Sequence, residues 1–354
     1  MKVRQINEYH ELKKIISDMI FDAGSGHYAS SMSALEVMYP LFYVDKIKPD
    51  QFILSKGHAA PALYAILYNL KYIDSLEGFR TYEGLPGHPE LGINGVSCSS
   101  GSLGMGISKA LGMAKMNPDK TYHVLVGDGE LQEGQNWEAL LYINRNQIDN
   151  VIVHVDGNRH QYSGESNFVD YVRILIDCKN VIIHHTQWEQ NNKYLTYPQL
   201  PQYTELVSSY ARHLYNLMLD NDKVIVLDAD LKNDFGLDII TNQFPGRFIE
   251  CGISEQHMVS MANGIAISGY YPVCHTFGAF YRRAIDQIYN NYQDGVHVVY
   301  VAGLVGDHPL NIGASHEATW GEELLSWLPD IMVTSDIEDL KYIGSQSIYL
   351  ELEI

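Results

Sequence analysis

The sequence predicts an α/β protein with two doubly wound parallel-sheet domains. Apolar runs at 124–126 and 151–155 enclose a segment with helical spacing, and together they make one βαβ unit. The segment VIVLDADL at 224–231 repeats the pattern of VLVGDGEL at 124–131, an apolar strand with acidic residues at its end. Strands that alternate with helices in this way form parallel sheets covered by helices on both faces. We therefore expect the same design in both halves of the chain.

The length of 354 residues allows two domains of ordinary size, each with its own core. We assign residues 1–190 to the first domain, 191–203 to a polar, proline-punctuated linker and 204–354 to the second domain. Helical spacing of apolar residues predicts helices, and short apolar runs bounded by turn residues predict strands. The predicted helices are at 6–21, 107–113 and 206–219, and the predicted strands are at 124–126, 151–155, 181–184, 224–227, 271–275, 296–302, 331–334 and 348–352.

Two of the predicted parallel strands end in residues that carry oxygen ligands. Asp128 follows the first strand, between Gly127 and Gly129, and Asn158 follows the second. The carboxyl ends of parallel strands meet at one edge of a sheet, where open α/β sheets bind their ligands. Magnesium takes a few oxygen ligands from protein, so Asp128, Asn158 and the backbone carbonyl of His160 predict a site for Mg²⁺, or Ca²⁺, holding a diphosphate. A Gly-Asp-Gly turn alone is also typical of an ordinary strand-to-helix connection, and the paired Asn158 favours the metal site.

The composition argues against two classes of partner. With 24 basic and 43 acidic residues the net charge is −19, which disfavours binding to nucleic acid or to anionic membranes. No apolar signal region opens the chain and no apolar run reaches membrane length, so we expect a soluble cytoplasmic protein. The cysteines lack metal-ligand spacing and are expected to be reduced packing residues; they are Cys98, Cys178, Cys251 and Cys274.

Three histidines each follow a glycine in a polar segment: His27, His58 and His88. A lone histidine is more often a surface or structural residue than a catalytic one. The segment 97–106 is dense in serine and glycine, which fits a flexible turn as well as a backbone that approaches a phosphate closely. These residues by themselves leave both interpretations open.

Several stretches together resemble the transketolase family. The Gly-Asp-Gly turn at Asp128 followed by Asn158 is similar to the thiamine-diphosphate motif of that family. The other matching stretches occur in the family's order along most of the chain: GSGHYASSMSALEVMY at 24–39, ILSKGHAAPALYAIL at 53–67, GLPGHPE at 84–90, SSGSLGMGISKALGMA at 99–114 and CGISEQHMVSMANGIA at 251–266.

The resemblance implies two domains of the thiamine-diphosphate-binding type. The first would hold the diphosphate of thiamine diphosphate, and the second would hold the aminopyrimidine ring. The third, C-terminal domain of the family is expected to be absent, since the sequence ends where it would begin. The family's cofactor lies between the first domain of one subunit and the second of another, which implies a homodimer with shared active sites. A separate partner chain is the alternative. Glu133 and Glu138 match acids that lie near the dimer axis in the family.

The resemblance also implies roles for individual residues. Those that would contact the diphosphate and the metal are Gly101, Leu103, Gly127, Asp128, Gly129 and Asn158. Those that would bind substrate hydroxyls and move protons are His27, His58, His88 and His316. Asp307 matches a substrate-reading aspartate, although about five extra residues near it depart from the family's pattern.

Glu255 is the implied proton-transfer residue of the second domain. In the family the matching glutamate hydrogen-bonds the pyrimidine ring and promotes loss of the cofactor's reactive proton, a positioned transfer of the kind that accelerates reactions by roughly 10²–10⁴-fold. Phe277 and Phe280 match an aromatic pair against which the ring packs. Without the resemblance, Glu255 would be read as a helix-facing glutamate and the two phenylalanines as core residues.

The implied activity is the transfer of a two-carbon ketol unit from a ketose donor to an aldehyde acceptor. Where the family has phosphate-binding arginines, this chain has Val207, and it has Glu351 and Glu353 near its last strand. Because acids repel a phosphate, we expect a sugar without a simple terminal phosphate, such as a nucleotide-linked or modified sugar. Two alternatives stay open: a synthase that decarboxylates a 2-oxo acid with the same cofactor, and a cofactor-binding protein without turnover.

Overall fold

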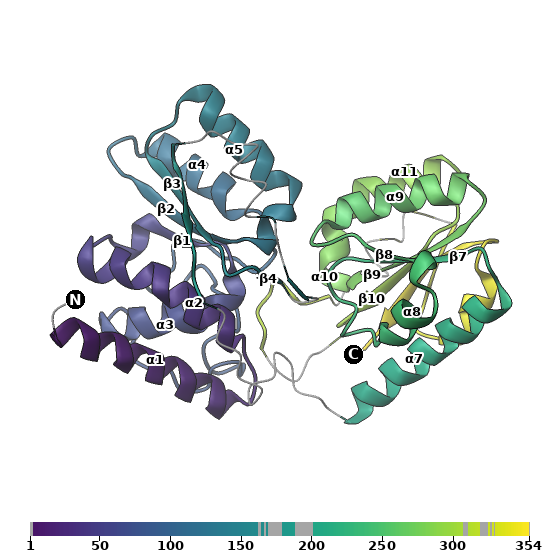
Figure 1. Ribbon diagram of the computed structural model, residues 1–354, viewed down its shortest axis with the longest axis horizontal. Coiled ribbons are helices and arrows are strands. Elements are labelled where there is room, and N and C mark those ends of the chain that lie inside the picture. The colour runs from purple at the N-terminus through teal and green to yellow at the C-terminus, as the bar shows by residue number, and fades with distance from the viewer. Residues whose placement is uncertain are drawn as a thin grey trace. The chain divides into compact units, whose positions relative to one another are not determined.

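The chain consists of two compact units in the computed structural model (Figure 1). Unit 1 comprises Met1–Pro198 with Pro309–Ser315, and unit 2 comprises Gln199–His308 with His316–Ile354. The structure describes residues 3–161, 164–165, 168, 179–187, 201–306, 311–318, 325, 328 and 330–353.

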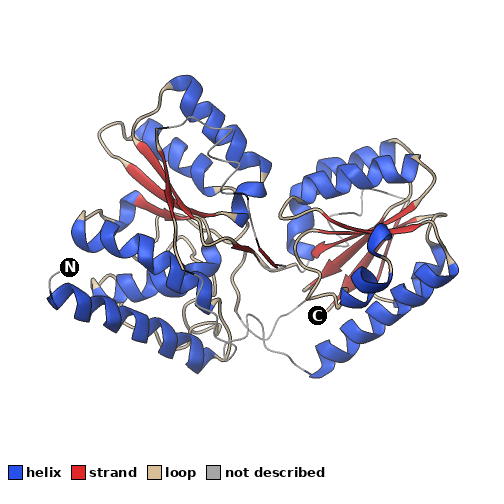
Figure 2. Ribbon diagram, viewed as in Figure 1, coloured by secondary structure: helices blue, strands red, loops and turns tan. Residues whose placement is uncertain are grey.

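Unit 1 is built on a parallel sheet with the strand order β1-β2-β3-β6 (Figure 2). Successive strand residues face opposite sides, so Leu125 joins the core cluster of the first three helices while Val124 and Val126 join a second cluster. Helices therefore cover both faces, α1 to α3 on one and α4 and α5 on the other (Figure 1). The elements are α1 (Val3–Ala23), α2 (Tyr28–Tyr39), β1 (Phe52–Leu54), α3 (Ala60–Asn69), α4 (Gly106–Met116), β2 (Tyr122–Gly127), α5 (Gly134–Asn146), β3 (Val151–Asp156) and β6 (Val181–His184).

Short elements connect these layers in unit 1. A five-residue π-helix continues α2, 3₁₀ turns precede or follow strands, and an antiparallel pair of strands follows β3. They are the π-helix Pro40–Val44, the 3₁₀ turns Pro49–Gln51, Gly57–Ala59 and Gly129–Gln132, and the strands β4 (His160–Gln161) and β5 (Gly164–Glu165).

Unit 2 is built on a second sheet, drawn in red in Figure 2. The sheet is parallel and has six strands in the order β11-β12-β10-β9-β7-β8. One core cluster packs α7 and α8 on one face, and another packs α9 and α11 on the opposite face. The helices are α7 (Pro201–Asp220), α8 (Asp238–Gln243), α9 (Glu255–Ile267), α10 (Gly278–Tyr281) and α11 (Ile285–Gln293), with 3₁₀ turns at Pro245–Arg247, Arg282–Ala284 and Ile337–Tyr342. The strands are β7 (Val224–Asp228), β8 (Phe248–Glu250), β9 (Tyr271–Phe277), β10 (Val299–Gly303), β11 (Ile331–Thr334) and β12 (Ser347–Leu352).

The predicted α/β class with two parallel-sheet halves is confirmed. Every predicted strand is present, but β1, β4, β5 and β8 were not predicted because each has only two or three residues. Helix α7 begins at Pro201, inside the range assigned to the linker, because proline is favoured in the first turn of a helix. In the part of the chain that the structure describes, no helix is both long and apolar enough to cross a membrane.

Three histidines form a hydrogen-bonded row across the sheet of unit 1. The Nδ1 atom of His123 lies 3.0 Å from Nε2 of His154, and Nδ1 of His154 lies 3.0 Å from Nε2 of His184. From each strand to the next, the histidine lies two residues further towards the carboxyl edge of the sheet. His154 pairs with Leu125, two residues after His123, and His184 pairs with Asp156, two residues after His154. It lies on the face that α1 to α3 cover, because Leu125 packs there.

Burial keeps this histidine row neutral. Burial, reinforced by the charges of His184 and His123, lowers the pKa of His154 to about 3. Burial also lowers the pKa of His123, against the opposing charge of Asp45, and the pKa of His184, against that of Asp156. All three groups therefore hold fewer protons in the folded chain than in the unfolded chain at mildly acidic pH.

Acid is expected to destabilise unit 1 through this row. A histidine whose folded pKa lies below its unfolded value of about 6.5 stabilises the fold above that pH, and the stability is lost as the pH falls. For His154 the loss between pH 7.5 and 5.5 is about 1.4 kcal/mol. Urea unfolding at these pH values should therefore show a shallower pH dependence in His154→Gln, whereas the exposed His10→Gln should match the wild type. Equal slopes in all three proteins would contradict the assignment.

Candidate functional site

The carboxyl edge of the unit 1 sheet brings Asp128 and Asn158 together. Gly127 at the end of β2 pairs with Asp156 at the end of β3, so the next residues of both strands enter neighbouring turns. Asp128 Oδ2 accepts a hydrogen bond of 2.6 Å from the backbone N–H of Arg159. Asn158 Oδ1 accepts one of 2.8 Å from the N–H of His160. Asp128 and Asn158, the residues expected to provide oxygen ligands, therefore both accept hydrogen bonds from the short turn that follows β3.

Asp128 is a buried carboxyl group whose charged form a bound cation would stabilise. It is 1% exposed, and burial raises its pKa to about 6, against the lowering effect of the Arg159 N–H and of the Lys56 ammonium. A carboxylate offers about four acceptor positions, and the N–H groups of Gly129 and Arg159 use two of them. The remaining acceptor positions of Asp128 are available to bind a cation.

A buried ion pair that was not predicted from the sequence acts on Asp128 through its charges. Lys56 Nζ lies 2.5 Å from Asp156 Oδ2, and the two side chains are 1% and 0% exposed. Ser33 donates a 2.7 Å hydrogen bond to the same carboxylate and accepts a 3.3 Å bond from Asn158 Nδ2. The only signal in the sequence was the position of Asp156 at the end of a strand.

Removing one partner of this pair should be costly. An unpaired charge left in a buried site costs about 3–5 kcal/mol, so Lys56→Met should lower the melting temperature by roughly 10 °C. The double variant Lys56→Met with Asp156→Leu should recover part of the loss, because the carboxylate that Lys56 pairs with directly is removed together with the ammonium. Lys14→Met, which breaks an exposed ion pair with Asp18, is the matched control and should melt like the wild type. A Lys56→Met protein that melts at the wild-type temperature would refute the pairing.

The glycine-rich segment before α4 has a shape that other residues would disturb. Gly101 has φ +136° and a Cβ there would lie 2.1 Å from Ser315 Oγ. Gly104 has φ +88° and a Cβ there would lie 2.7 Å from Cβ of Glu133. L-residues rarely adopt such φ values, so both positions favour glycine on conformational and steric grounds. Leu103 lies between them and is partly exposed.

The three histidines that follow glycines gather around this segment. The rings of His27 and His58 are 5.0 Å apart between centroids. A Cβ at Gly57, next to His58, would lie 2.7 Å from the Gly101 nitrogen, and a Cβ at Gly101 would lie 3.1 Å from Cδ2 of His88. The structure therefore brings together residues from four separate stretches of the sequence.

His58 and His88 are held in the neutral form. Burial, followed by the charges of Lys56 and His88, lowers the pKa of His58 well below its usual value. Burial lowers the pKa of His88 to about 4, helped by the charge of Arg80. Nδ1 of His88 lies 2.5 Å from the carbonyl oxygen of Ile312, so Nδ1–H donates and Nε2 is the acceptor nitrogen.

Glu255 is a buried acid of unit 2. It is the first residue of α9 and is 3% exposed. Its Oε2 accepts no hydrogen bond from the residues that the structure describes, and lies 3.7 Å from Nη1 of Arg283. A buried carboxylate oxygen without a donor is costly, which marks this side chain as a place where a ligand N–H can bind.

Phe277, Phe280 and His316 form an aromatic cluster in unit 2. The centroids of the two phenylalanine rings are 5.7 Å apart, and those of Phe280 and His316 are 5.1 Å apart with nearly perpendicular planes. Phe277 ends β9 and Phe280 lies in α10. Asp307, the expected substrate-reading residue, lies outside the described residues.

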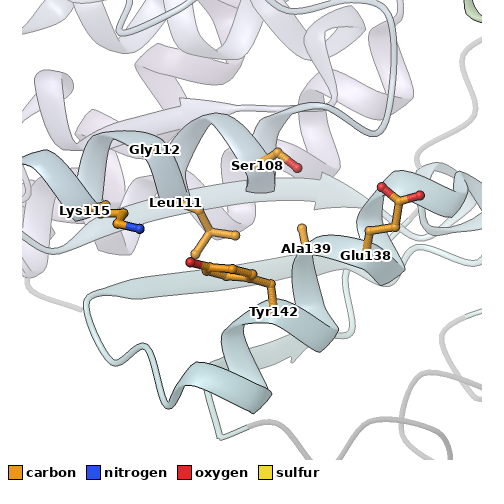
Figure 3. A pocket seen from close by; sticks show the side chains of 7 residues that line it. All are labelled: Ser108, Leu111, Gly112, Lys115, Glu138, Ala139 and Tyr142. Carbon is orange, nitrogen blue, oxygen red and sulfur yellow. The ribbon is translucent and has the colours of Figure 1, made fainter.

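A groove of about 340 Å³ lies between α4 and α5, and Figure 3 shows the side chains that line it. Its walls combine apolar side chains with one acid and one base, and they are formed by Ser108, Leu111, Gly112, Lys115, Glu138, Ala139 and Tyr142. Among the described residues, no group of three His, Cys, Asp or Glu side chains is arranged to hold a metal ion. A cation at Asp128 would therefore need ligands beyond side chains of these types.

Comparisons with known proteins define the class of the chain. The family described as "Transketolase, thiamine diphosphate binding domain" matches residues 6–173, and "Transketolase, pyrimidine binding domain" matches residues 204–347. Both domains are those of thiamine-diphosphate-binding proteins, in the order expected from the sequence. The chain belongs to the transketolase family.

Individual relatives agree with this membership. Human transketolase is 31% identical over 368 residues, which cover 75% of this chain and 59% of the human protein. The chain thus spans little more than half the length of that relative. A 1-deoxy-D-xylulose-5-phosphate synthase of Clostridium acetobutylicum is 24% identical over 438 residues, covering 94% of this chain and 69% of that protein. A solved transketolase of Campylobacter jejuni covers 99% of this chain and 78% of its own, with 18% identity and a TM-score of 0.48.

Proposed function

We propose that this chain is a transketolase-like enzyme that transfers a two-carbon ketol unit from a ketose to an aldehyde with thiamine diphosphate and a divalent cation. The observation that carries the proposal is the buried Glu255, whose Oε2 has no described hydrogen-bond donor, in a chain with both cofactor-binding domains of the family. A binding protein without turnover has no need of this acid. The test is product formation by the purified full chain supplied with cofactor, Mg²⁺, a ketose and an aldehyde.

The diphosphate and its cation would be held in unit 1. Asp128, the side-chain oxygen of Asn158 and the carbonyl of His160 are the proposed ligands of Mg²⁺ or Ca²⁺. The buried carboxyl of Asp128, whose pKa burial raises to about 6, supports this because a cation offsets its desolvation. Gly101, Gly127 and Gly129 are the proposed backbone contacts of the diphosphate, since glycines allow close approach, and Leu103 is proposed with them from its match to the family's glycine-rich segment.

The pyrimidine ring would be held in unit 2. Glu255 is proposed to accept a hydrogen bond from a ring nitrogen through its buried Oε2, while Phe277 and Phe280 pack against the ring. When bound, thiamine diphosphate supplies a carbon that adds to a ketose carbonyl and takes up the electron pair of the broken carbon–carbon bond. Glu255 is the residue of this chain that promotes the first proton transfer.

The histidines would handle substrate hydroxyl groups. His27, His58, His88 and His316 are the proposed residues, with Asp307 as a further substrate contact. Neutral His88 donates from Nδ1 to Ile312 and thus presents Nε2 as an acceptor, the form that a base needs. The low pKa values of His58 and His88 keep this form available throughout the neutral pH range.

The substrate is proposed to lack a simple terminal phosphate. Val207 and the acids Glu351 and Glu353 stand where the family has phosphate-binding arginines, and acids repel a phosphate. A nucleotide-linked or otherwise modified sugar fits this site better. Turnover with xylulose 5-phosphate should therefore be slow in comparison with an unphosphorylated ketose. Tight binding and fast turnover of the phosphate would overturn this part of the proposal.

A homodimer with shared sites is the proposed assembly. Helix α5 exposes Leu141 and Tyr142, which are 63% and 44% exposed, beside Glu138. Exposed large apolar side chains next to each other favour an interface. Light scattering of the purified chain should give a dimer, and Leu141→Glu should shift it towards the monomer. A monomeric wild type would favour the alternative, a separate partner chain.

The second candidate reaction uses the same cofactor site. A relative that is a 1-deoxy-D-xylulose-5-phosphate synthase aligns with most of this chain, which favours considering decarboxylation of a 2-oxo acid followed by condensation with an aldehyde. Release of carbon dioxide from pyruvate in the presence of an aldehyde would identify this reaction. Ketol transfer without carbon dioxide release would identify the first.

A further inference from the structure

Glu130 is a buried carboxylate that the proposed chemistry does not use. It lies in the 3₁₀ turn directly after the Gly-Asp-Gly turn and is 2% exposed. Its Oε1 accepts a hydrogen bond of 2.8 Å from the N–H of Gly104 and another from the hydroxyl of Ser55. Its Oε2 accepts one of 3.1 Å from the N–H of Gly127. One side chain thus joins the end of its own strand, at Gly127, to two segments that are distant in the sequence, at Ser55 and Gly104.

Ser55 extends these contacts to the start of α4. Its Oγ donates to Glu130 and accepts a 3.1 Å hydrogen bond from the N–H of Gly106, the first residue of that helix. A Cβ at Gly106 would lie 2.4 Å from Cβ of Ser55, so the approach of these two backbones depends on glycine. The glycine-rich segment is thereby attached at both Gly104 and Gly106 to the ends of β1 and β2.

The backbone of Glu130 is itself fixed. Its carbonyl oxygen accepts a 2.6 Å hydrogen bond from Nδ2 of Asn136, and the next carbonyl, that of Leu131, accepts one of 2.8 Å from the indole of Trp137. Both donors belong to α5. The carboxylate of Glu130 therefore projects from a turn whose backbone is held in place by side chains of α5.

Only a carboxylate satisfies all three donors. Two backbone N–H groups and one hydroxyl point at it, and a carboxylate carries acceptors on both oxygens. A glutamine of the same size would place an NH₂ against either Gly104 or Gly127 and would keep at most one of the two backbone bonds. An alanine would leave both buried N–H groups without a partner, which costs the full desolvation of each.

We propose that Glu130 is a positioning residue, which fixes the segment 101–106 in the shape that receives the cofactor diphosphate. It acts through Gly104, Gly106 and Gly127 and does not itself touch the ligand. The inference rests on the proposed function of this segment and adds a residue that determines its shape. A residue that merely fills space at this position would allow an uncharged side chain of equal volume to replace it.

The test compares Glu130→Gln and Glu130→Ala with the wild type, and uses Asp149→Asn as the matched control. Asp149 is an exposed acid in the turn between α5 and β3. Titration calorimetry with thiamine diphosphate at fixed Mg²⁺ measures affinity, and amide hydrogen exchange at Gly104 and Gly127 measures the attachment without any ligand. Ser55→Ala, which keeps the carboxylate, provides a milder second variant.

We expect the affinity to fall by about 10-fold in Glu130→Gln and about 100-fold in Glu130→Ala, with no change in Asp149→Asn. Exchange at Gly104 or Gly127 should accelerate by about 10- to 100-fold in Glu130→Gln, the equivalent of one lost hydrogen bond to a charged group. In Ser55→Ala, exchange at Gly106 should accelerate while Gly104 stays protected.

Wild-type affinity in a folded Glu130→Gln protein, together with unchanged exchange at both glycines, would overturn the proposal. A wild type that binds no thiamine diphosphate would count against the proposed function, and exchange would then decide on Glu130 alone. Protected glycines in the wild type and unprotected ones in Glu130→Gln would still support the attachment, whereas equal exchange in the two proteins would reject it.

Discussion

Replacing Glu255 with glutamine is expected to slow deuterium exchange at the reactive carbon of bound thiamine diphosphate by about 10²–10⁴-fold. The side chain is 3% exposed and its Oε2 accepts no hydrogen bond from described residues. Glutamine keeps the volume and one acceptor oxygen but has no charge to support a proton on the ring nitrogen. Cofactor affinity should therefore change far less than the exchange rate. The measurement is quenched exchange followed by NMR of the released cofactor.

Two controls make this result specific to Glu255. Asp286→Asn removes an exposed acid from α11 of the same unit and should exchange at the wild-type rate. Arg283→Met removes the cation that lies 3.7 Å from Glu255 and should have a smaller effect, because this distance is longer than a hydrogen bond. Wild-type exchange in a Glu255→Gln protein that binds the cofactor would eliminate this residue as the proton-transfer group.

Replacing Asp128 with alanine is expected to weaken the joint binding of thiamine diphosphate and Mg²⁺ by roughly 10²–10³-fold. Losing a buried, hydrogen-bonded partner of a charge costs about 3–4 kcal/mol, and each 1.4 kcal/mol is a factor of ten. Asp128 is 1% exposed, so water replaces the lost carboxylate poorly. Titration calorimetry with thiamine diphosphate at fixed Mg²⁺ gives the dissociation constants of the wild type and of Asp128→Ala.

Asp128→Asn separates charge from local structure. An asparagine keeps an oxygen that accepts the N–H of Arg159, now bonded at 2.6 Å, but removes the negative charge. If the carboxylate is a metal ligand, this variant should bind nearly as poorly as Asp128→Ala while melting at a higher temperature than Asp128→Ala, because asparagine keeps one of the two backbone hydrogen bonds, those from Gly129 and Arg159. If Asn restores wild-type affinity, the role of Asp128 is only to hold the turn, and the metal assignment is wrong.

Local sequence patterns were sufficient to predict the parallel strands and the pairing at their ends. The turn that joins Asp128 to Asn158 follows from the direction of β2 and β3 alone, because parallel strands place their carboxyl ends at one edge. The strands β1 and β8 were missed because three residues are too few to show a period. The start of α7 was missed because the prolines near it were read as linker residues.

The supporting residues of the site could not be predicted from local patterns. Lys56 and Asp156 are 100 positions apart, and Ser55 and Glu130 are 75 positions apart. Such pairs depend on the register of β1, β2 and β3 in the sheet, and short sequence patterns do not reveal this register. The histidine row likewise depends on the register that sets His154 opposite Leu125. The family resemblance suggested the residues proposed for cofactor contact, and the structure adds residues that hydrogen-bond to the same segments.

We propose that this chain binds thiamine diphosphate through a divalent cation. Titration calorimetry of thiamine diphosphate into the full wild-type chain, once with Mg²⁺ and once with excess EDTA, tests it most directly. We predict saturable binding near one cofactor per chain with Mg²⁺, and no measurable heat with EDTA. Absence of binding in both solutions, or equal binding in both, would contradict the account.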